Sequence, residues 1–257
     1  MAKRTFDSLE GVFVDVAKRK RDAASQRFRA RPTSVESPRD VYLQACAQTA
    51  AEFVADGFKY AKTGPHLSKR SPDFLFRVSF QSSHNNVAGL HVVLWMHANV
   101  SSPTLMKWRT EQPHPYRKDG YVAGGMVHLL EQKHPMIEWE LADPTDRNET
   151  VQDAVSFIRS SVLPYFAQFE NPKNVIEKLR TSKINAFDVA SSVEFTLCFG
   201  AKADAQAVVT RFLGERPDLR NAVEESLARL RERGFPSLFL TCYADQIAWV
   251  RLAYGLA

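Results

Sequence analysis

Two histidines in the first half of the chain are the residues best suited to acid–base chemistry. His91 and His97 are six positions apart, so on a regular β-strand they share one face. A histidine in a cleft can act as a general acid or base because its charge changes near neutral pH. Two interpretations stay open: this face is a ligand or substrate surface, or helices cover it and the histidines form hydrogen bonds in the core. The residues expected on or beside this face are Arg77, Gln81, His91, Trp95 and His97.

No catalytic or metal-binding motif strengthens the enzyme interpretation. The histidines His114, His128 and His134 lack the spacing of metal ligands, and no His-Glu-x-x-His sequence is present. No serine lies in a Gly-x-Ser-x-Gly elbow. Glu138 and Glu140 are two acids at strand spacing, which we interpret as a solvated strand face and not as an acid–base pair. We therefore expect no metal and no cofactor.

The segment 112–125 is a second candidate surface. It is a long loop rich in proline, aromatic residues and charge. Aromatic and arginine side chains are the usual anchors of protein interfaces. The alternative is an ordinary surface connection, since proline-rich loops are common connectors. The candidate anchors in and just before this loop are Trp108, Arg109, His114, Tyr116 and Arg117.

A β-hairpin is expected to position the first candidate surface. Apolar and polar residues alternate through 74–83 and again through 89–99, which predicts two strands with one buried face each. The polar residues between them suit a connection between antiparallel strands. Further strands are expected at 58–60, 121–130 and 136–141, with a bulge or bend at Gly124-Gly125 and a polar turn region at 63–72.

The rest of the chain is predicted to be helical. Capping residues and apolar spacing predict helices near 38–56, 101–109, 145–162, 171–179, 203–213, 219–233 and 244–256. Pro164 is expected to kink or end the helix before it. The segment 182–200 stays open between a strand and a buried helix. The fold class is therefore α+β, with an antiparallel sheet of four to five strands flanked by helices and a mostly helical C-terminal part. The expected domain is 37–257, with the sheet in 37–142 and the helical part in 143–257.

Positive charge is concentrated in an N-terminal arm, residues 1–36. This arm has nine basic and five acidic residues, a net +4, whereas the whole chain of 257 residues carries +5. An amphipathic stripe begins at Phe6, so one interpretation is a helix docked by its apolar face with a solvated basic end. The alternative is an arm that binds nucleic acid. Its basic cluster is Lys18, Arg19, Lys20 and Arg21.

Composition places the chain among ordinary globular proteins. No apolar run approaches the roughly 18 residues of a membrane span, and no export signal is visible, so we expect a cytoplasmic protein without membrane contact. The three cysteines, Cys46, Cys198 and Cys242, are far apart in apolar surroundings and are expected to be buried reduced thiols.

The segments Asp56–Tyr60, Phe74–Ser83 and Gly89–Leu94, together with Leu163-Pro-Tyr-Phe-Ala-Gln-Phe169, resemble the bacterial domain-of-unknown-function family 4304. The resemblance covers roughly residues 41–179. It implies an intracellular bacterial α+β domain and supplies no catalytic residues.

We expect a non-catalytic binding or interaction protein, of the immunity type or a regulatory adaptor, with a protein partner. One alternative is a hydrolase-like enzyme with a cleft lined by histidine and arginine, which requires Arg77, His91 and His97 to converge on one pocket. The other is nucleic-acid binding through the basic arm.

Overall fold

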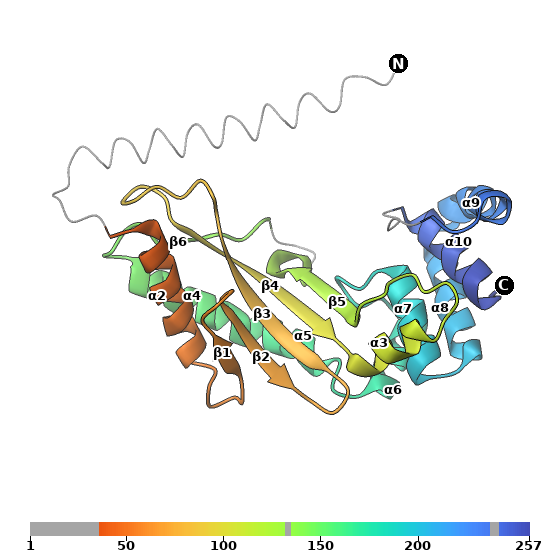
Figure 1. The fold of residues 1–257 in the computed structure, drawn as a ribbon, viewed down its shortest axis with the longest axis horizontal. Coiled ribbons are helices and arrows are strands. Elements are labelled where there is room, and N and C mark those ends of the chain that lie inside the picture. Colours follow the sequence, from red (N-terminus) through yellow and green to blue (C-terminus); the bar gives the residue numbers. More distant parts are fainter. Residues whose placement is uncertain (1–35, 132–134, 237–241) are drawn as a thin grey trace, which may run out of the picture.

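The computed structural model describes residues 36–131, 135–236 and 242–257. The molecule is elongated (Figure 1). The sheet with helices α2 (Pro38–Ala51), α4 (Arg147–Phe157) and α5 (Leu163–Ala167) forms one end. The other end is formed by helices α7 (Val189–Phe199), α8 (Lys202–Glu215), α9 (Arg220–Arg233) and α10 (Tyr243–Tyr254). This arrangement confirms the predicted α+β class, with an antiparallel sheet and a helical C-terminal part. Apart from Glu36, the predicted N-terminal arm lies outside the described residues, as does His134. No helix in the described ranges is long and apolar enough to cross a membrane.

The sheet is antiparallel throughout, in the order β1-β2-β3-β4-β5, and β6 pairs with the other half of β4. The predicted hairpin is confirmed: β3 and β4 pair from Leu75 opposite Ser101 to Ser82 opposite Leu94. The strands are β1 Lys59–Ala61, β2 His66–Arg70, β3 Leu75–Ser82, β4 Val93–Ser101, β5 Tyr121–Met126 and β6 Trp139–Glu140.

Strand β2 corrects the expectation of a polar turn at 63–72. Only Leu67 of its residues is buried, so its side chains carry little apolar alternation. Five backbone positions pair with β3 and three with β1. Backbone hydrogen bonding to two neighbours therefore makes this polar segment a strand.

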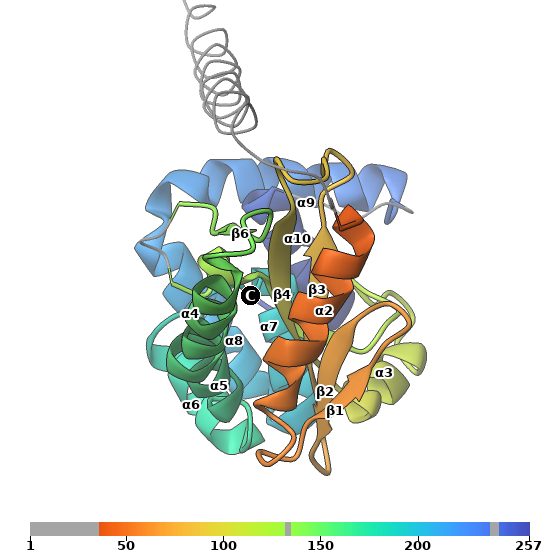
Figure 2. The same cartoon turned by 90° about the vertical axis from the view of Figure 1, so that its left-hand side faces the viewer.

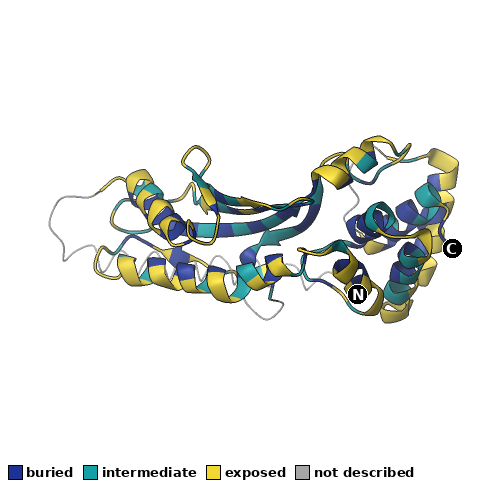
Figure 3. Cartoon of the chain, turned by 90° about the horizontal axis from the view of Figure 1, so that it is seen from below, coloured by how far each residue is buried: buried dark blue, intermediate teal, exposed yellow. Residues whose placement is uncertain are grey.

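One face of the sheet carries the core, and we call it the covered face. Helices α4 and α5 lie against this face and leave the opposite face uncovered (Figures 2 and 3). Aromatic contacts join the layers, with ring centroids 5.1 Å apart between Phe76 and Phe166 and 5.6 Å apart between Trp139 and Phe157. Helix α2, Pro38–Ala51, contacts β1, β2 and α4. Helix α4 is Arg147–Phe157 and α5 is Leu163–Ala167.

Two outcomes were predicted at Pro164, a kink or the end of the helix, and the second is wrong because the helical run continues through it. A π-helical turn, Ile158–Val162, joins α4 to α5 directly before it. Proline has no N–H and its ring crowds the carbonyl four residues earlier, so a regular α-turn is disfavoured there. The wider π-turn is the local solution to that conflict.

The helical part begins at α6 and is joined to the sheet by α3 and α7. The open question about 182–200 resolves as a helix, α7, in which Val189 to Thr196 are all buried. Its Phe195 stacks on Phe74, with ring centroids 6.1 Å apart, which links the helical part to the start of β3. The helices are α3 Pro103–Thr110, α6 Pro172–Thr181, α7 Val189–Phe199, α8 Lys202–Glu215, α9 Arg220–Arg233 and α10 Tyr243–Tyr254.

The glycine pair in β5 allows a close approach between strands. A Cβ on Gly124 would lie 2.1 Å from the carbonyl oxygen of Ala98, and its φ of +134° is rarely adopted by other residues. The amide of Gly124 donates to the carbonyl of Ala186 (2.7 Å), so the segment before α7 covers this edge. The irregular pairing that we predicted at the glycines falls instead beside Val122, between the pairs of Tyr121 and Ala123.

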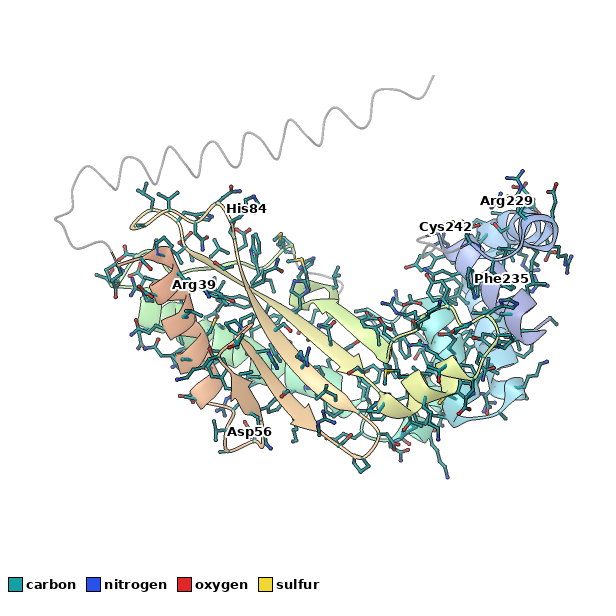
Figure 4. The ribbon with its side chains drawn as sticks, viewed as in Figure 1. Arg39, Asp56, His84, Arg229, Phe235 and Cys242 are labelled. Atoms are coloured by element: carbon teal, nitrogen blue, oxygen red, sulfur yellow. The ribbon has the colours of Figure 1, made fainter. Side chains whose placement is uncertain are left out.

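The cysteines differ from one another in exposure. Cys46 is buried and Cys198 is half-buried, and burial raises the pKa of the Cys198 thiol to about 11. Cys242 is exposed, so the expectation of a buried thiol is wrong there. It sits just before α10 at the surface of the helical part (Figure 4).

Candidate functional site

The uncovered face of the sheet, which we call the open face, faces the viewer in Figure 1. Its residues follow from the pairing, because directly opposed residues in antiparallel strands point to the same side. Those of β1 to β5 form four rows across the strands, and beyond them Val93 of β4 lies opposite Glu140 of β6. The rows are Gln81-Trp95, Ala61-His66-Ser79-His97-Met126, Lys59-Ser68-Arg77-Asn99-Gly124 and Arg70-Leu75-Ser101-Tyr121.

The predicted group on β3 and β4 does assemble on this face. Trp95 lies directly opposite Gln81, and Nε2 of His97 donates to the side-chain oxygen of Gln81 (2.8 Å). The indole N–H of Trp95 donates to Glu138 (3.3 Å), which restrains the ring. Partial burial, with a further contribution from nearby His128, lowers the pKa of His97 and favours its neutral form. Gln81, Trp95 and His97 thus form an ordered cluster of uncharged side chains, in which Trp95 and His97 are half-buried and Gln81 is exposed.

Below this cluster, the open face is basic. Lys59, Arg70 and Arg77 are exposed and make no side-chain hydrogen bond or ion pair with any described residue. The outward residues of β1 to β5 include no carboxylate. Among the described residues, acidic groups border the face where β6 joins, at Glu138 and Glu140, and beside Tyr121, where Asp119 accepts from the Tyr121 amide (3.1 Å) and pairs with Arg117. The three cations without a described partner therefore lie toward the end of the strands opposite to β6.

His91 does not join this group. It lies before β4 and donates from Nδ1 to Glu140 (2.6 Å), whose other oxygen accepts from the amides of Val92 (2.7 Å) and Ala142 (3.1 Å). Six residues separate it from His97, up to about 20 Å of extended chain. The interaction of His91 with Glu140 thus stabilises the end of the sheet where β6 pairs with β4. The convergence of His91, His97 and Arg77 that the enzyme alternative requires is absent.

Arg109, one of the predicted anchors, is an interior residue. Its side chain is 0% exposed and its Nε donates to Glu194, also 0% exposed, across 2.7 Å. It also donates to the carbonyls of Asp119 (2.8 Å) and Tyr121 (2.6 Å). Charge on a loop suggested a surface role, but the loop folds back over α3, so this arginine cannot reach a partner.

Glu194 organises the other side of the same cluster. It accepts hydrogen bonds from the hydroxyl of Tyr254 (2.8 Å) and from the amide of Tyr116. Burial raises the pKa of the Glu194 carboxyl, while Arg109 and these two donors act in the opposite direction. The cluster joins α3, the loop after it, α7 and α10, and it is structural.

The remaining loop anchors also contact the helical part. Trp108 packs on Tyr254, with ring centroids 5.7 Å apart, and buried Tyr116 packs on Trp249 at 5.9 Å. The ring of His114 stacks on Phe235 at 4.3 Å.

Phe235 lies at the α9–α10 end of the molecule, far from His84 at the tip of the β3–β4 connection (Figure 4). Arg117 lies over the Tyr121 ring (4.3 Å) and pairs with Asp119. Arg117 therefore reaches the edge of the open face through Tyr121, whereas the other four anchors, Trp108, Arg109, His114 and Tyr116, pack in the helical part.

Sequence reasoning missed half of the open face. Lys59, His66 and Arg70 were not proposed, because β2 was read as a turn and β1 as a short strand without a known register. The signal that could have placed them is the polar alternation around Leu67, which is too short to stand out alone.

Two cavities of the described structure lie elsewhere. One of about 260 Å³ lies between β2 and α5, lined by Phe58, Lys69 and Phe166 among others. Another of about 360 Å³ lies where Arg231 of α9 faces the end of α10. Neither contains a residue of the open face. Among the described residues, no three His, Cys, Asp or Glu side chains form a group that could hold a metal ion.

No family model, curated protein or solved structure that was compared with the chain matches it. The resemblance to domain-of-unknown-function family 4304 accordingly stays an expectation from the sequence.

Proposed function

We propose that this chain is a non-catalytic binding protein and that the open face is its recognition surface. The observation that carries the proposal is the exposed, unpaired Arg77 on a sheet face that no described helix covers, in the row below His97. An exposed arginine without a partner adds no stabilising interaction to the fold. Arginine and tryptophan are, however, residues that often dominate binding energies.

The rigidity of the surface supports the same proposal. The outward side chains lie on paired strands, and Trp95 and His97 are already held by Glu138 and Gln81. A surface that is ordered before binding loses less conformational entropy when a partner arrives. The open face is therefore suited to recognition without rearrangement of its backbone.

The proposal keeps the binding function expected from the sequence but assigns it to the sheet face without the loop. The loop anchors Arg109 and Tyr116 are buried, so the recognition surface is the sheet face instead. A role in the cytoplasm, as an immunity-type protein or a regulatory adaptor, belongs to this proposal. The three residues that the hydrolase-like alternative requires in one pocket, Arg77, His91 and His97, line neither of the two cavities described above.

Affinity capture with three immobilised proteins tests the proposal. The wild type is compared with Arg77→Glu, which reverses the unpaired charge, and with Arg220→Glu, a matched reversal at an exposed, unpaired arginine of α9. We expect at least one macromolecule that the wild type and Arg220→Glu retain and Arg77→Glu loses. Identical capture by all three proteins, or hydrolytic activity that disappears in His97→Ala, would refute the proposal.

A further inference from the structure

We propose that the ligand of the open face is single-stranded nucleic acid. Its phosphates would contact Lys59, Arg70 and Arg77, and an unpaired base would lie against Trp95. This inference rests on the proposed function and names the chemical class of the partner.

The spacing of the cations fits a flexible polyanion. Arg77 lies two strands from Lys59, about 10 Å away, and one strand and two residues from Arg70, about 8 Å away. Trp95 lies one strand and four residues from Arg77, about 14 Å away. A strand that crosses the sheet diagonally can therefore meet the three cations first and the indole afterwards.

The groups between the cations and Trp95 suit the edges of bases. Gln81 and Asn99 carry amides, Ser79 carries a hydroxyl, and His97 is held largely neutral. Each of these can both donate and accept a hydrogen bond with small adjustments. Single-stranded nucleic acids are recognised by such contacts together with stacking on aromatic rings.

The composition of the face favours nucleic acid over an acidic protein. The outward residues of β1 to β5 include only four aliphatic side chains, Ala61, Leu75, Val93 and Met126. The centre of a protein interface is mostly apolar and poor in charge. Protein–nucleic-acid interfaces are more polar and far more positive, as are the outward residues of β1 to β3, which include Lys59, Arg70 and Arg77 and no carboxylate.

A single strand fits better than a duplex. A base inside a duplex is stacked on its neighbours, so only an unpaired base can place its face on Trp95. The cations lie on strands of the sheet, which present side chains from a broad surface and not from a protruding helix or ribbon that could enter a groove.

Fluorescence anisotropy of labelled oligonucleotides with the full-length protein tests the inference. The probes are single-stranded RNA and DNA of about 12 nucleotides and a matched duplex. For three phosphate contacts we expect a log–log salt slope of about −2, and Arg77→Ala should reduce its magnitude by about 0.7. Trp95→Ala should weaken binding by about 5- to 150-fold while Trp95→Phe, which keeps an aromatic face, loses much less.

The controls separate the open face from the basic arm. Arg220→Glu should bind as the wild type does. A full-length variant with glutamine at Lys18, Arg19, Lys20 and Arg21 should retain the dependence on Trp95. Loss of binding in the arm variant, with no effect of Arg77→Ala or Trp95→Ala, would overturn the inference in favour of the arm. Thermal melts of each variant show whether a loss of binding is caused by a loss of folding. Trp95→Phe is the check on folding at this position, because it should fold and bind nearly as the wild type does.

Three further outcomes would also overturn the inference. They are absence of oligonucleotide binding by the wild type, equal affinity for the duplex, and binding of a polyglutamate peptide that depends equally on Arg77. If capture still identifies a species lost in Arg77→Glu, the proposed function stands while this inference fails. If neither oligonucleotides nor any captured species depend on Arg77, both fail.

Discussion

Replacing Arg109 with methionine should destabilise the protein by about 3–5 kcal/mol. The substitution keeps an unbranched chain but removes a guanidinium that is 0% exposed and bonded to Glu194. It leaves a buried carboxylate without its counter-charge and deprives the carbonyls of Asp119 and Tyr121 of a donor. Each orphaned buried group alone costs about 1–3 kcal/mol, which agrees with that range.

The defect should depend on pH in a defined direction. Burial already raises the pKa of Glu194, and loss of Arg109 removes an opposing interaction, so the pKa rises further in Arg109→Met. The folded state then binds a proton that the unfolded state has released. Stability is therefore retained below the ordinary carboxyl pKa and lost as pH rises from there through the raised pKa. We expect a smaller defect near pH 4–5 than near pH 8.

Urea denaturation followed by tryptophan fluorescence and circular dichroism measures this defect. For a chain of this size, 3–5 kcal/mol corresponds to a loss of roughly 6–20 °C in melting temperature. The double variant Arg109→Met/Glu194→Gln should be more stable than Arg109→Met, because the amide keeps an acceptor for Tyr254 without a buried charge. Arg180→Met, at an exposed ion pair with Asp204, should lose less than about 1 kcal/mol. An Arg109→Met protein as stable as Arg180→Met, or a defect that does not change with pH, would refute the reasoning.

Three further predictions test other features. Gly124→Ala should lower the melting temperature or prevent folding, because its Cβ would meet a backbone carbonyl of β4. Gly214→Ala, in α8 with open space around it, should instead raise stability by about 0.5–1 kcal/mol. Equal melting temperatures of the two variants would contradict this. Phe195→Ala should cost about 3–5 kcal/mol in urea unfolding, since this fully buried ring stacks on Phe74, and a cost under about 1 kcal/mol would show that the two parts of the molecule do not depend on this contact. Because the pKa of His97 is lowered, the folded state binds fewer protons than the unfolded state just below about pH 6.5, so stability falls as pH falls through that value. His97→Gln should flatten the dependence of unfolding free energy on pH between about pH 5 and 8. An unchanged dependence in this variant would argue against the shift.

Local features of the sequence were sufficient to predict the elements with strong periodicity or caps. The alternation through 74–83 and 89–99 predicted the paired strands β3 and β4, because a period of two exposes one consistent face. Ser102 and Asn171 cap α3 and α6 through their side chains, as their residue types predict. These signals depend only on neighbouring residues, so no tertiary information was needed.

The candidate site was predicted only in part. Gln81, Trp95 and His97 were placed correctly on one face with Arg77, because the register of a single hairpin relates them. Lys59 and Arg70 were missed because their position depends on pairing between three segments, of which one has almost no apolar pattern. Register across a sheet is a property of several segments together and is weakly specified where a strand is polar.

Tertiary structure alone decided which charged residues are buried and which helix is central. Arg109 looks like a surface anchor in the sequence, and only the position of Glu194, 85 residues later, makes it an interior residue. The apolar run of α7 fits a strand or a helix equally well until α3, α8 and α10 surround it. Burial of a residue depends on what covers it, and the covering elements come from distant parts of the chain, so local patterns cannot determine it.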